Sequence, residues 1–185
     1  MRLFARPGRK TAIAAALASA ALFALGAAWA GEPEGDASAG CAQHKWPLAH
    51  EAALLSKLAA PALSGFDAEW SADKADAFAV ALEPSGEAPF IIPPERKAGG
   101  DTYSGVVRLS GVKAGVYQIT LSDAAWIDVV QDGRFASTQG FSGAPGCPAR
   151  KSVRFVLKDG EATLQLSGAG VKEIGVIVSA LPASD

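Results

Sequence analysis

The chain has 185 residues, of which 49 % are hydrophobic, with 17 basic and 19 acidic side chains. Residues 1–30 hold four of the basic residues and none of the acidic ones, so residues 31–185 hold 13 basic and 19 acidic ones, a net charge of −6. The densest basic group, Arg150-Lys151 with Arg154, is interpreted as cations on a strand surface, and no nucleic-acid partner is expected. The 155 residues after the first 30 are enough for one domain with a hydrophobic core.

The first 30 residues carry the pattern of an export signal. A basic start is followed by an apolar run over 11–30, which is rich in Ala and Leu and ends in Ala28-Trp29-Ala30. We therefore expect a signal peptide at 1–30, cleaved after Ala30, and a periplasmic or secreted protein. The apolar run is also long enough to span a bilayer, so membrane attachment is the alternative if the segment is not cleaved.

The two cysteines of the chain, Cys41 and Cys147, both lie beyond the signal segment. In an exported protein an even number of cysteines usually forms disulfides, so we expect these two to be paired. The bond would tie the start of the folded chain, after a flexible leader at 31–40, to the Gly- and Pro-rich loop 140–148. No Cys-x-x-Cys motif is present, which disfavours a redox or metal-binding role for the thiols.

A single short helix is predicted near the N-terminus of the mature chain. Pro47 suits a first helical position, and apolar residues recur at helical spacing from Leu48 to Leu58, which predicts a helix near 47–59. From Phe78 onward the hydrophobic period changes to two, which is typical of half-buried strands.

About eight strands are predicted, and turn residues separate them. They are expected at 78–82, 105–109, 116–122, 126–131, 134–137, 153–157, 163–167 and 173–180, with 90–92 as a further short candidate. Asp132-Gly133 is the strongest hairpin signal. Because no helix-length pattern separates the strands, we expect an all-β fold, an antiparallel and jelly-roll-like β-sandwich that forms a single domain over 41–185.

Three of these strands resemble known secreted modules. The segments Gly115 to Leu121, Trp126 to Val130 and Leu164 to Gly168 are similar to bacterial pre-peptidase C-terminal domains, and the similarity covers roughly residues 104–180. The resemblance implies a β-sandwich that accompanies secreted enzymes and aids binding or maturation.

A longer part of the chain, from Cys41 onward, resembles an uncharacterised family of small exported proteobacterial proteins. The residues that carry this similarity are Cys41, Trp46, His50-Glu51, Trp126 to Val130, Gly146-Cys147-Pro148 and Arg150-Lys151. Members are sometimes labelled homogentisate 1,2-dioxygenase, a name that would imply an iron enzyme.

A mononuclear iron site needs about two histidines and a carboxylate around an open position. The chain has only two histidines, His44 and His50, and a site would need both of them to converge with Glu51. Residues 50 and 51 are neighbours on the predicted helix and project about 100° apart, so they cannot easily share one metal. We therefore predict no metal and no cofactor, and His44, His50 and Glu51 remain the weaker alternative of a small metal-dependent enzyme.

A serine hydrolase is also disfavoured. Ser142 lies in Gly140-Phe141-Ser142-Gly143, which approaches a nucleophile elbow, but Ala144 stands where the final Gly is needed and no helix follows. Both histidines lie about ninety residues earlier, although the expected disulfide would bring their segment close to this loop.

Trp126 and Asp128 have the same parity on one predicted strand, so both should project from one face. An exposed face would make them a platform on which a sugar ring stacks. The simpler interpretation is that Trp126 belongs to the core, while Asp128 caps a turn or pairs with Arg134.

From these patterns we expect an exported, non-catalytic binding or structural accessory protein. Its partner would be a protein or a glycan that the sequence does not identify. A carbohydrate-binding module at Trp126 and Asp128, and a small metal-dependent enzyme, are the alternatives.

Overall fold

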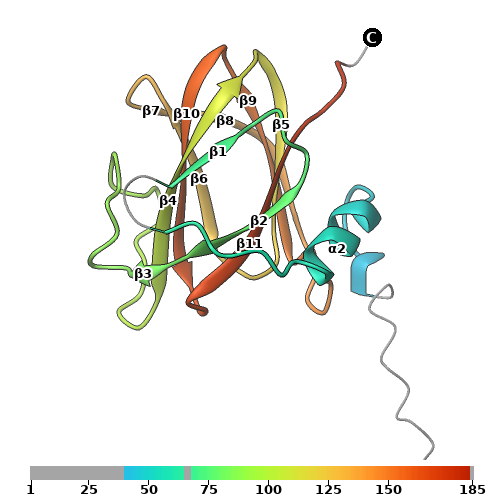
Figure 1. The fold of residues 1–185 in the computed structure, drawn as a ribbon, viewed down its shortest axis with the longest axis horizontal. Helices are drawn as coiled ribbons and strands as arrows, with labels where there is room; N and C mark the ends of the chain where they lie inside the picture. The colour runs from blue at the N-terminus through green and yellow to red at the C-terminus, as the bar shows by residue number, and fades with distance from the viewer. Residues whose placement is uncertain (1–39, 65–67, 184–185) are drawn as a thin grey trace, which may run out of the picture. The chain divides into compact units, whose positions relative to one another are not determined.

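Two β-sheets packed face to face form the body of the protein (Figure 1). The computed structural model describes residues 40–64 and 68–183, and the predicted signal peptide at 1–30 lies outside them, as does the predicted leader except for its last residue. The first sheet has the order β2 (Ala77–Ala81), β11 (Glu173–Ala180), β5 (Gly115–Leu121), β9 (Lys151–Leu157), β8 (Ser137–Gly143). The second sheet has the order β1 (Glu69–Ser71), β4 (Tyr103–Val112), β10 (Gly160–Ala169), β6 (Trp126–Gln131), β7 (Arg134–Phe135), and β3 (Glu83–Pro84) also pairs with β4.

The strand order is that of a jelly roll. If β7 and β8 are taken as one strand bent at Ala136, the eight main strands run first-eighth-third-sixth in one sheet and second-seventh-fourth-fifth in the other. The fifth strand changes sheet, because β7 pairs with β6 while β8 pairs with β9. The predicted jelly-roll-like sandwich of about eight strands is therefore confirmed, and the short strands β1 and β3 are additions to it.

The alternation of side chains along the strands explains the core between the sheets. On β6 and β10 the register pairs Ile127 with Leu166 and Val129 with Leu164, and all four side chains are buried among residues of the first sheet such as Phe155. Burial of each such side chain contributes roughly 1.5–3 kcal/mol to folding. The residues between them, Trp126, Asp128, Gln165 and Ser167, consequently face the outer side of the second sheet.

The hairpin between β6 and β7 has the turn that its sequence predicts. Asp132 and Gly133 have φ values of 50° and 68°. Two positive φ values in succession are what a type I′ turn requires, and the Asp-Gly pair adopts them at low cost.

The connection between helix and strands differs from the prediction. Residues 69–71 form β1, which runs parallel to β4, although the sequence predicted no strand there and only antiparallel pairing. The three residues are too few to show a period of two, so no local pattern could reveal them.

The predicted short strand at 90–92 is wrong. The backbone N–H groups of Ile91 and Ile92 donate to the side-chain oxygen of Gln165, and the Gln165 amide donates to the Ile92 carbonyl. A buried side chain of β10 thus takes the bonds that a neighbouring strand would have made. We call residues 88–95 the covering segment, because its contacts hold it on the outer face of the second sheet.

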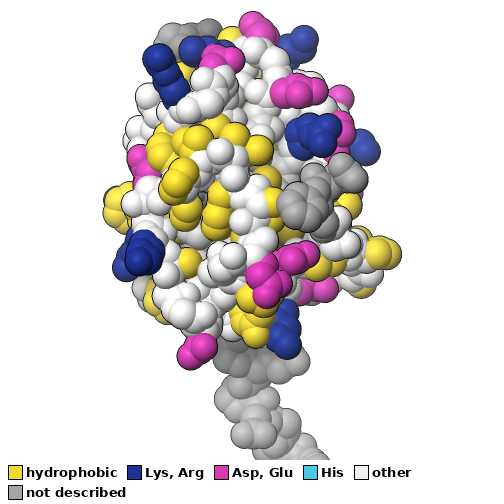
Figure 2. Space-filling view, turned by 90° about the vertical axis from the view of Figure 1, so that its left-hand side faces the viewer, with side chains coloured by type: hydrophobic (Ala, Val, Ile, Leu, Met, Phe, Trp, Pro, Cys, Tyr) yellow, Lys and Arg dark blue, Asp and Glu magenta, His cyan; other side chains and the backbone are white. Residues whose placement is uncertain are grey.

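Figure 2 looks onto the side of the molecule where β3 and the covering segment lie. Hydrophobic side chains gather in the middle of this face, with Lys, Arg, Asp and Glu side chains around them. Ile91, which is 58 % exposed, belongs to the covering segment. The segment therefore buries its backbone bonds while it leaves apolar side chains at the surface.

Helix α2 (Ala49–Ser56) packs on the outer face of the first sheet (Figure 1). Ala52 and Leu55 form a small apolar cluster with Leu48 and with Ile177 of β11. The helix predicted near 47–59 is confirmed but is shorter at both ends. None of the helices in the described ranges has the length and apolar character that a membrane crossing needs.

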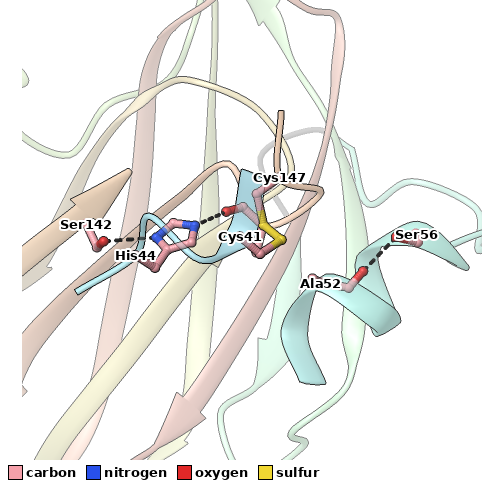
Figure 3. Close-up of a disulfide and its surroundings, with 7 residues drawn as sticks. Cys41, His44, Ala52, Ser56, Ser142 and Cys147 are labelled. Atoms are coloured by element: carbon pink, nitrogen blue, oxygen red, sulfur yellow. Dashed lines mark hydrogen bonds between the residues drawn. A yellow bond between two sulfur atoms is a disulfide. The ribbon is translucent and has the colours of Figure 1, made fainter. Parts of the chain in front are cut away.

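A disulfide joins Cys41 to Cys147, as predicted (Figure 3). Beside it, the His44 ring donates from Nε2 to the Ala149 carbonyl at 2.7 Å and accepts the Ser142 hydroxyl at Nδ1, 2.9 Å away. A carbonyl can only accept, and this fixes the two roles in the neutral ring. The disulfide and these two hydrogen bonds, with a third from the Lys45 N–H to the Ser142 hydroxyl, bind the N-terminal segment to β8 and to the loop that follows it. A disulfide is consistent with an oxidising compartment.

We expect Cys41→Ser and Cys147→Ser to lower the free energy of unfolding by the same amount, and the double variant to be no worse than either single one. The disulfide closes a loop of 106 residues, for which the chain-entropy model gives at most about 5 kcal/mol. Chemical denaturation of the three variants measures this. Clearly unequal losses would show that the two thiols have separate roles.

Gly40→Ala is expected to destabilise the tether, because the new Cβ would lie 2.8 Å from the Gly146 carbonyl carbon and 2.9 Å from its oxygen. These are backbone atoms, so no side-chain rotation relieves the clash, and a loss of about 1–3 kcal/mol follows. Gly115→Ala is the matched control, since nothing lies within 4 Å of its Cβ. Equal thermal stability of the two variants would contradict this packing.

Candidate functional site

A cleft of about 910 Å³ opens where β6 of the second sheet lies next to β9 of the first. Its walls come from Glu95 at the end of the covering segment and residues 96–99 after it, the start of β6, the end of β8, the start of β9 and the end of β10. The volume is within the range of about 300–1,000 Å³ that small-molecule sites occupy. The change of sheet between β7 and β8 places these elements around one hollow.

Trp126 lies in the wall of this cleft and outside the core between the sheets. Its side chain is half-buried, and its indole N–H donates to Asp128 Oδ1 at 2.8 Å. Trp126 and Asp128 therefore lie together on the outer face of the second sheet, as their spacing of two residues along β6 predicts. Asp128 itself is 3 % exposed and is no part of an open surface.

The second oxygen of Asp128 accepts the backbone N–H of Glu95 at 3.1 Å. One carboxylate thus holds the Trp126 ring and the end of the covering segment in fixed positions. Burial raises the pKa of Asp128 above its usual value, and the two hydrogen bonds oppose this shift. Asp128 is not among the lining residues, and it acts on the cleft through Trp126 and Glu95.

Two cations lie near the Trp126 ring. Lys151 Nζ is 5.0 Å and the Arg96 guanidinium carbon 5.8 Å from the ring centroid, distances at which a cation is attracted to the ring. Lys151 also donates to the Ala125 carbonyl at 2.6 Å. Burial lowers the pKa of Lys151, and the neighbouring charge of Arg96 lowers it further.

Ser167 lies directly across the β6–β10 pair from Trp126 and lines the same cleft. It is 2 % exposed, and within the described part of the chain its hydroxyl has no hydrogen-bond partner. An unsatisfied buried hydroxyl costs about 1–3 kcal/mol, which makes this group a candidate to pair with a bound molecule. The Trp46 indole N–H, outside the lining, is the other buried side-chain group without a partner in the described part of the chain. Phe141 adds a second aromatic side chain to the lining and is 64 % exposed.

The residues of the metal hypothesis are engaged at separate places. His44 has both ring nitrogens bound beside the disulfide, His50 is exposed on α2, and Glu51 accepts a hydrogen bond from the Gln118 amide at 2.8 Å. No group of three or more His, Cys, Asp or Glu side chains that could hold a metal ion occurs within residues 40–64 and 68–183. These donors do not fit the iron site that the dioxygenase label would imply.

The structure brings Ser142 and His44 together, which the sequence could only suggest through the disulfide. Ser142 is 2 % exposed, and its oxygen also accepts the backbone N–H of Lys45 at 2.9 Å. A nucleophile must present its oxygen to a substrate. Ser142 is among the residues that line the cleft, but its hydroxyl is bonded to His44 and to the Lys45 N–H of the N-terminal segment. The pair therefore acts as a clamp for that segment (Figure 3).

Several lining residues carried no signal that sequence analysis could use. Arg96 and Lys97 follow a Pro-rich stretch without periodicity, and Ser167 has the pattern of a solvent-facing strand residue. The sequence indicates Arg150 and Lys151 only as cations on a strand surface. Only tertiary structure brings them into one cleft.

No protein-family model, no curated protein and no solved structure matches this chain. The class of this protein is therefore defined by its fold and its candidate site alone. It is a jelly-roll β-sandwich with a disulfide-bound N-terminal helix and with an aromatic, cation-lined cleft between the sheet edges.

Replacing Asp128 with Asn is expected to lower the free energy of unfolding by about 1–3 kcal/mol at pH 7, because an amide oxygen can accept only one of the two donors well and its NH₂ group faces the other. The difference should widen in favour of the wild type as pH falls. Burial raises the pKa of Asp128 in the folded protein, so the wild type gains stability as this carboxyl is protonated, and the gain is complete below the unfolded pKa.

Thermal unfolding of both proteins at pH values between about 7 and 4 measures this difference. Contributions from groups distant from Asp128 are common to the two proteins and cancel in the difference. A difference that stays constant or narrows on acidification would show that burial is not the dominant influence on this carboxyl.

Proposed function

We propose that the protein is exported and works in the periplasm or outside the cell as a non-catalytic binding protein, with the cleft at Trp126 as its ligand site. The basic start and apolar run of residues 1–30 support export, and the disulfide agrees with an oxidising compartment. The resemblance to small exported proteins points the same way.

The single observation that carries a binding role is the combination of Trp126 with Ser167 in the wall of the cleft. A half-buried indole, fixed by Asp128, stands beside a buried hydroxyl without a partner. A ligand with an apolar face and hydroxyl groups can use both, because the face covers the ring and a hydroxyl pairs with the orphan group. This description fits a carbohydrate, and we propose a saccharide as the ligand.

Two features support binding without catalysis. Asp128 is 3 % exposed and is not among the residues that line the cleft, which disfavours a role for its carboxylate in proton transfer or in attack on a substrate. The Ser142 hydroxyl is bonded to His44 and to the Lys45 N–H of the N-terminal segment. Glu95 is then the one carboxylate in the lining, whereas glycoside hydrolysis needs a pair.

Trp126→Ala is expected to weaken glycan binding by about tenfold or more, because the ring contributes both apolar area and fixed geometry. A broad glycan array followed by titration calorimetry on the purified protein measures the loss. Ile91→Ala is the control, since it removes an exposed apolar side chain outside the lining.

Circular dichroism and the unfolding temperature show whether Trp126→Ala still folds. If the wild-type protein binds no glycan on the array, or if folded Trp126→Ala binds as well as the wild type, the proposed function is wrong.

A further inference from the structure

The cleft concentrates positive charge in a protein whose mature part is negative. Four cations line it, Arg96, Lys97, Arg150 and Lys151, against the single carboxylate of Glu95. Over residues 31–185, in contrast, acidic side chains outnumber basic ones by 19 to 13. Walls of one charge sign raise the local concentration of ligands of the opposite sign. The local excess of positive charge therefore indicates that the cleft attracts anions.

No ion pair in the described ranges neutralises these cations. The ion pairs found there join Arg108 to Glu69 and Lys158 to Asp132, and neither pair reaches the cleft. Asp128 is the buried carboxylate near Lys151, and its charge partly offsets that of this one cation. Arg96, Lys97 and Arg150 take part in no ion pair within the described ranges, so their charges are open to an arriving ligand.

Trp126 also keeps these charges in place. Arg96 and Lys151 lie 5.8 and 5.0 Å from its ring centroid, so the ring attracts both cations and restricts where they stand. Lys151 is held further by its bond to the Ala125 carbonyl. Cations restrained in advance lose less conformational freedom when they bind an anion, which strengthens binding.

We infer that the ligand of this cleft is an acidic saccharide, a sugar chain that carries carboxylate or sulfate groups. Its apolar sugar face would pack in the part of the cleft lined by Trp126 and Phe141. Its anionic groups would meet Arg96, Lys97 and Arg150, which present several N–H donors to oxyanions. This inference rests on the proposed function and narrows it to one chemical class.

Other anions fit the cleft less well. A free inorganic anion would fill a small part of about 910 Å³ and would leave the aromatic side chains uncovered. A nucleic acid needs an extended basic surface, and the acidic balance of residues 31–185 opposes it. A neutral saccharide would leave the excess positive charge of the lining uncompensated.

The test compares a tetramer of galacturonic acid with the same tetramer after methyl esterification, by titration calorimetry on the purified protein. A sulfated galactose tetramer is the second acidic probe, and inorganic sulfate tests for a free anion. We expect at least one acidic tetramer to bind about tenfold or more tightly than the ester, and its affinity to fall as salt is added.

Arg96→Gln should weaken binding of the acidic tetramer by about tenfold, since it removes one charge-assisted contact. Lys113→Gln is the matched control, because this exposed lysine lies in the turn between β4 and β5, outside the lining, and its loss should change affinity less than twofold.

The outcomes separate this inference from the proposed function. Glycan binding that depends on Trp126 but is equal for the acid and the ester, and is unaffected by Arg96→Gln, would overturn the acidic class and leave a saccharide-binding site. Binding of inorganic sulfate as tight as that of the tetramers would overturn it as well. The absence of binding to any saccharide would contradict the proposed function itself.

Discussion

The register between β6 and β10 is the constraint on which the candidate site depends. It pairs Ile127 with Leu166 inside the sandwich, where apolar burial favours the pairing, and it thereby places Trp126 opposite Ser167 on the outer side. A shift of β6 by one residue would turn Trp126 inward and expose Ile127 and Val129. The pairing of core residues thus fixes the geometry of the polar site beside them.

Polar residues on the outer faces hold the segments that cover the sheets. Gln165 binds three backbone groups of the covering segment and Asp128 binds a fourth, while Ser142 binds the N-terminal segment through His44 and Lys45. Buried polar groups of this kind are stable only when they are paired. The same bonds explain why loops without regular structure keep defined positions beside the cleft.

Much of the fold could be predicted from the sequence because its signals are local. The period of two predicted most of the main strands, the helical spacing after Pro47 predicted α2, and the even cysteine count predicted the Cys41–Cys147 bond. The prediction of a loop from residue 140 was wrong, because β8 extends to Gly143 with a sequence of mostly small and polar residues that lacks the hydrophobic alternation of a strand. The candidate site could be predicted only in part. Trp126 and Asp128 share a strand, so their parity was visible, whereas Arg96 and Ser167 reach the cleft through contacts between distant segments.

The same limit explains the wrong prediction at 90–92. An apolar run of three residues has the composition of a strand, and its backbone does need partners, but a side chain of a distant strand provides them. Local sequence patterns indicate which backbone N–H and C=O groups need hydrogen-bond partners, but they do not indicate which residue elsewhere in the chain supplies those partners.

The position of β11 has a consequence for the order in which the chain acquires its structure. The last strand lies between β2 and β5, so neither of these two early strands has its full set of neighbours until residues 173–180 have been synthesised. Pairing between the two ends of a chain is slow, because a long loop must close before any bond rewards it. The first sheet of this topology can therefore be completed only when the last residues of the described chain have left the ribosome.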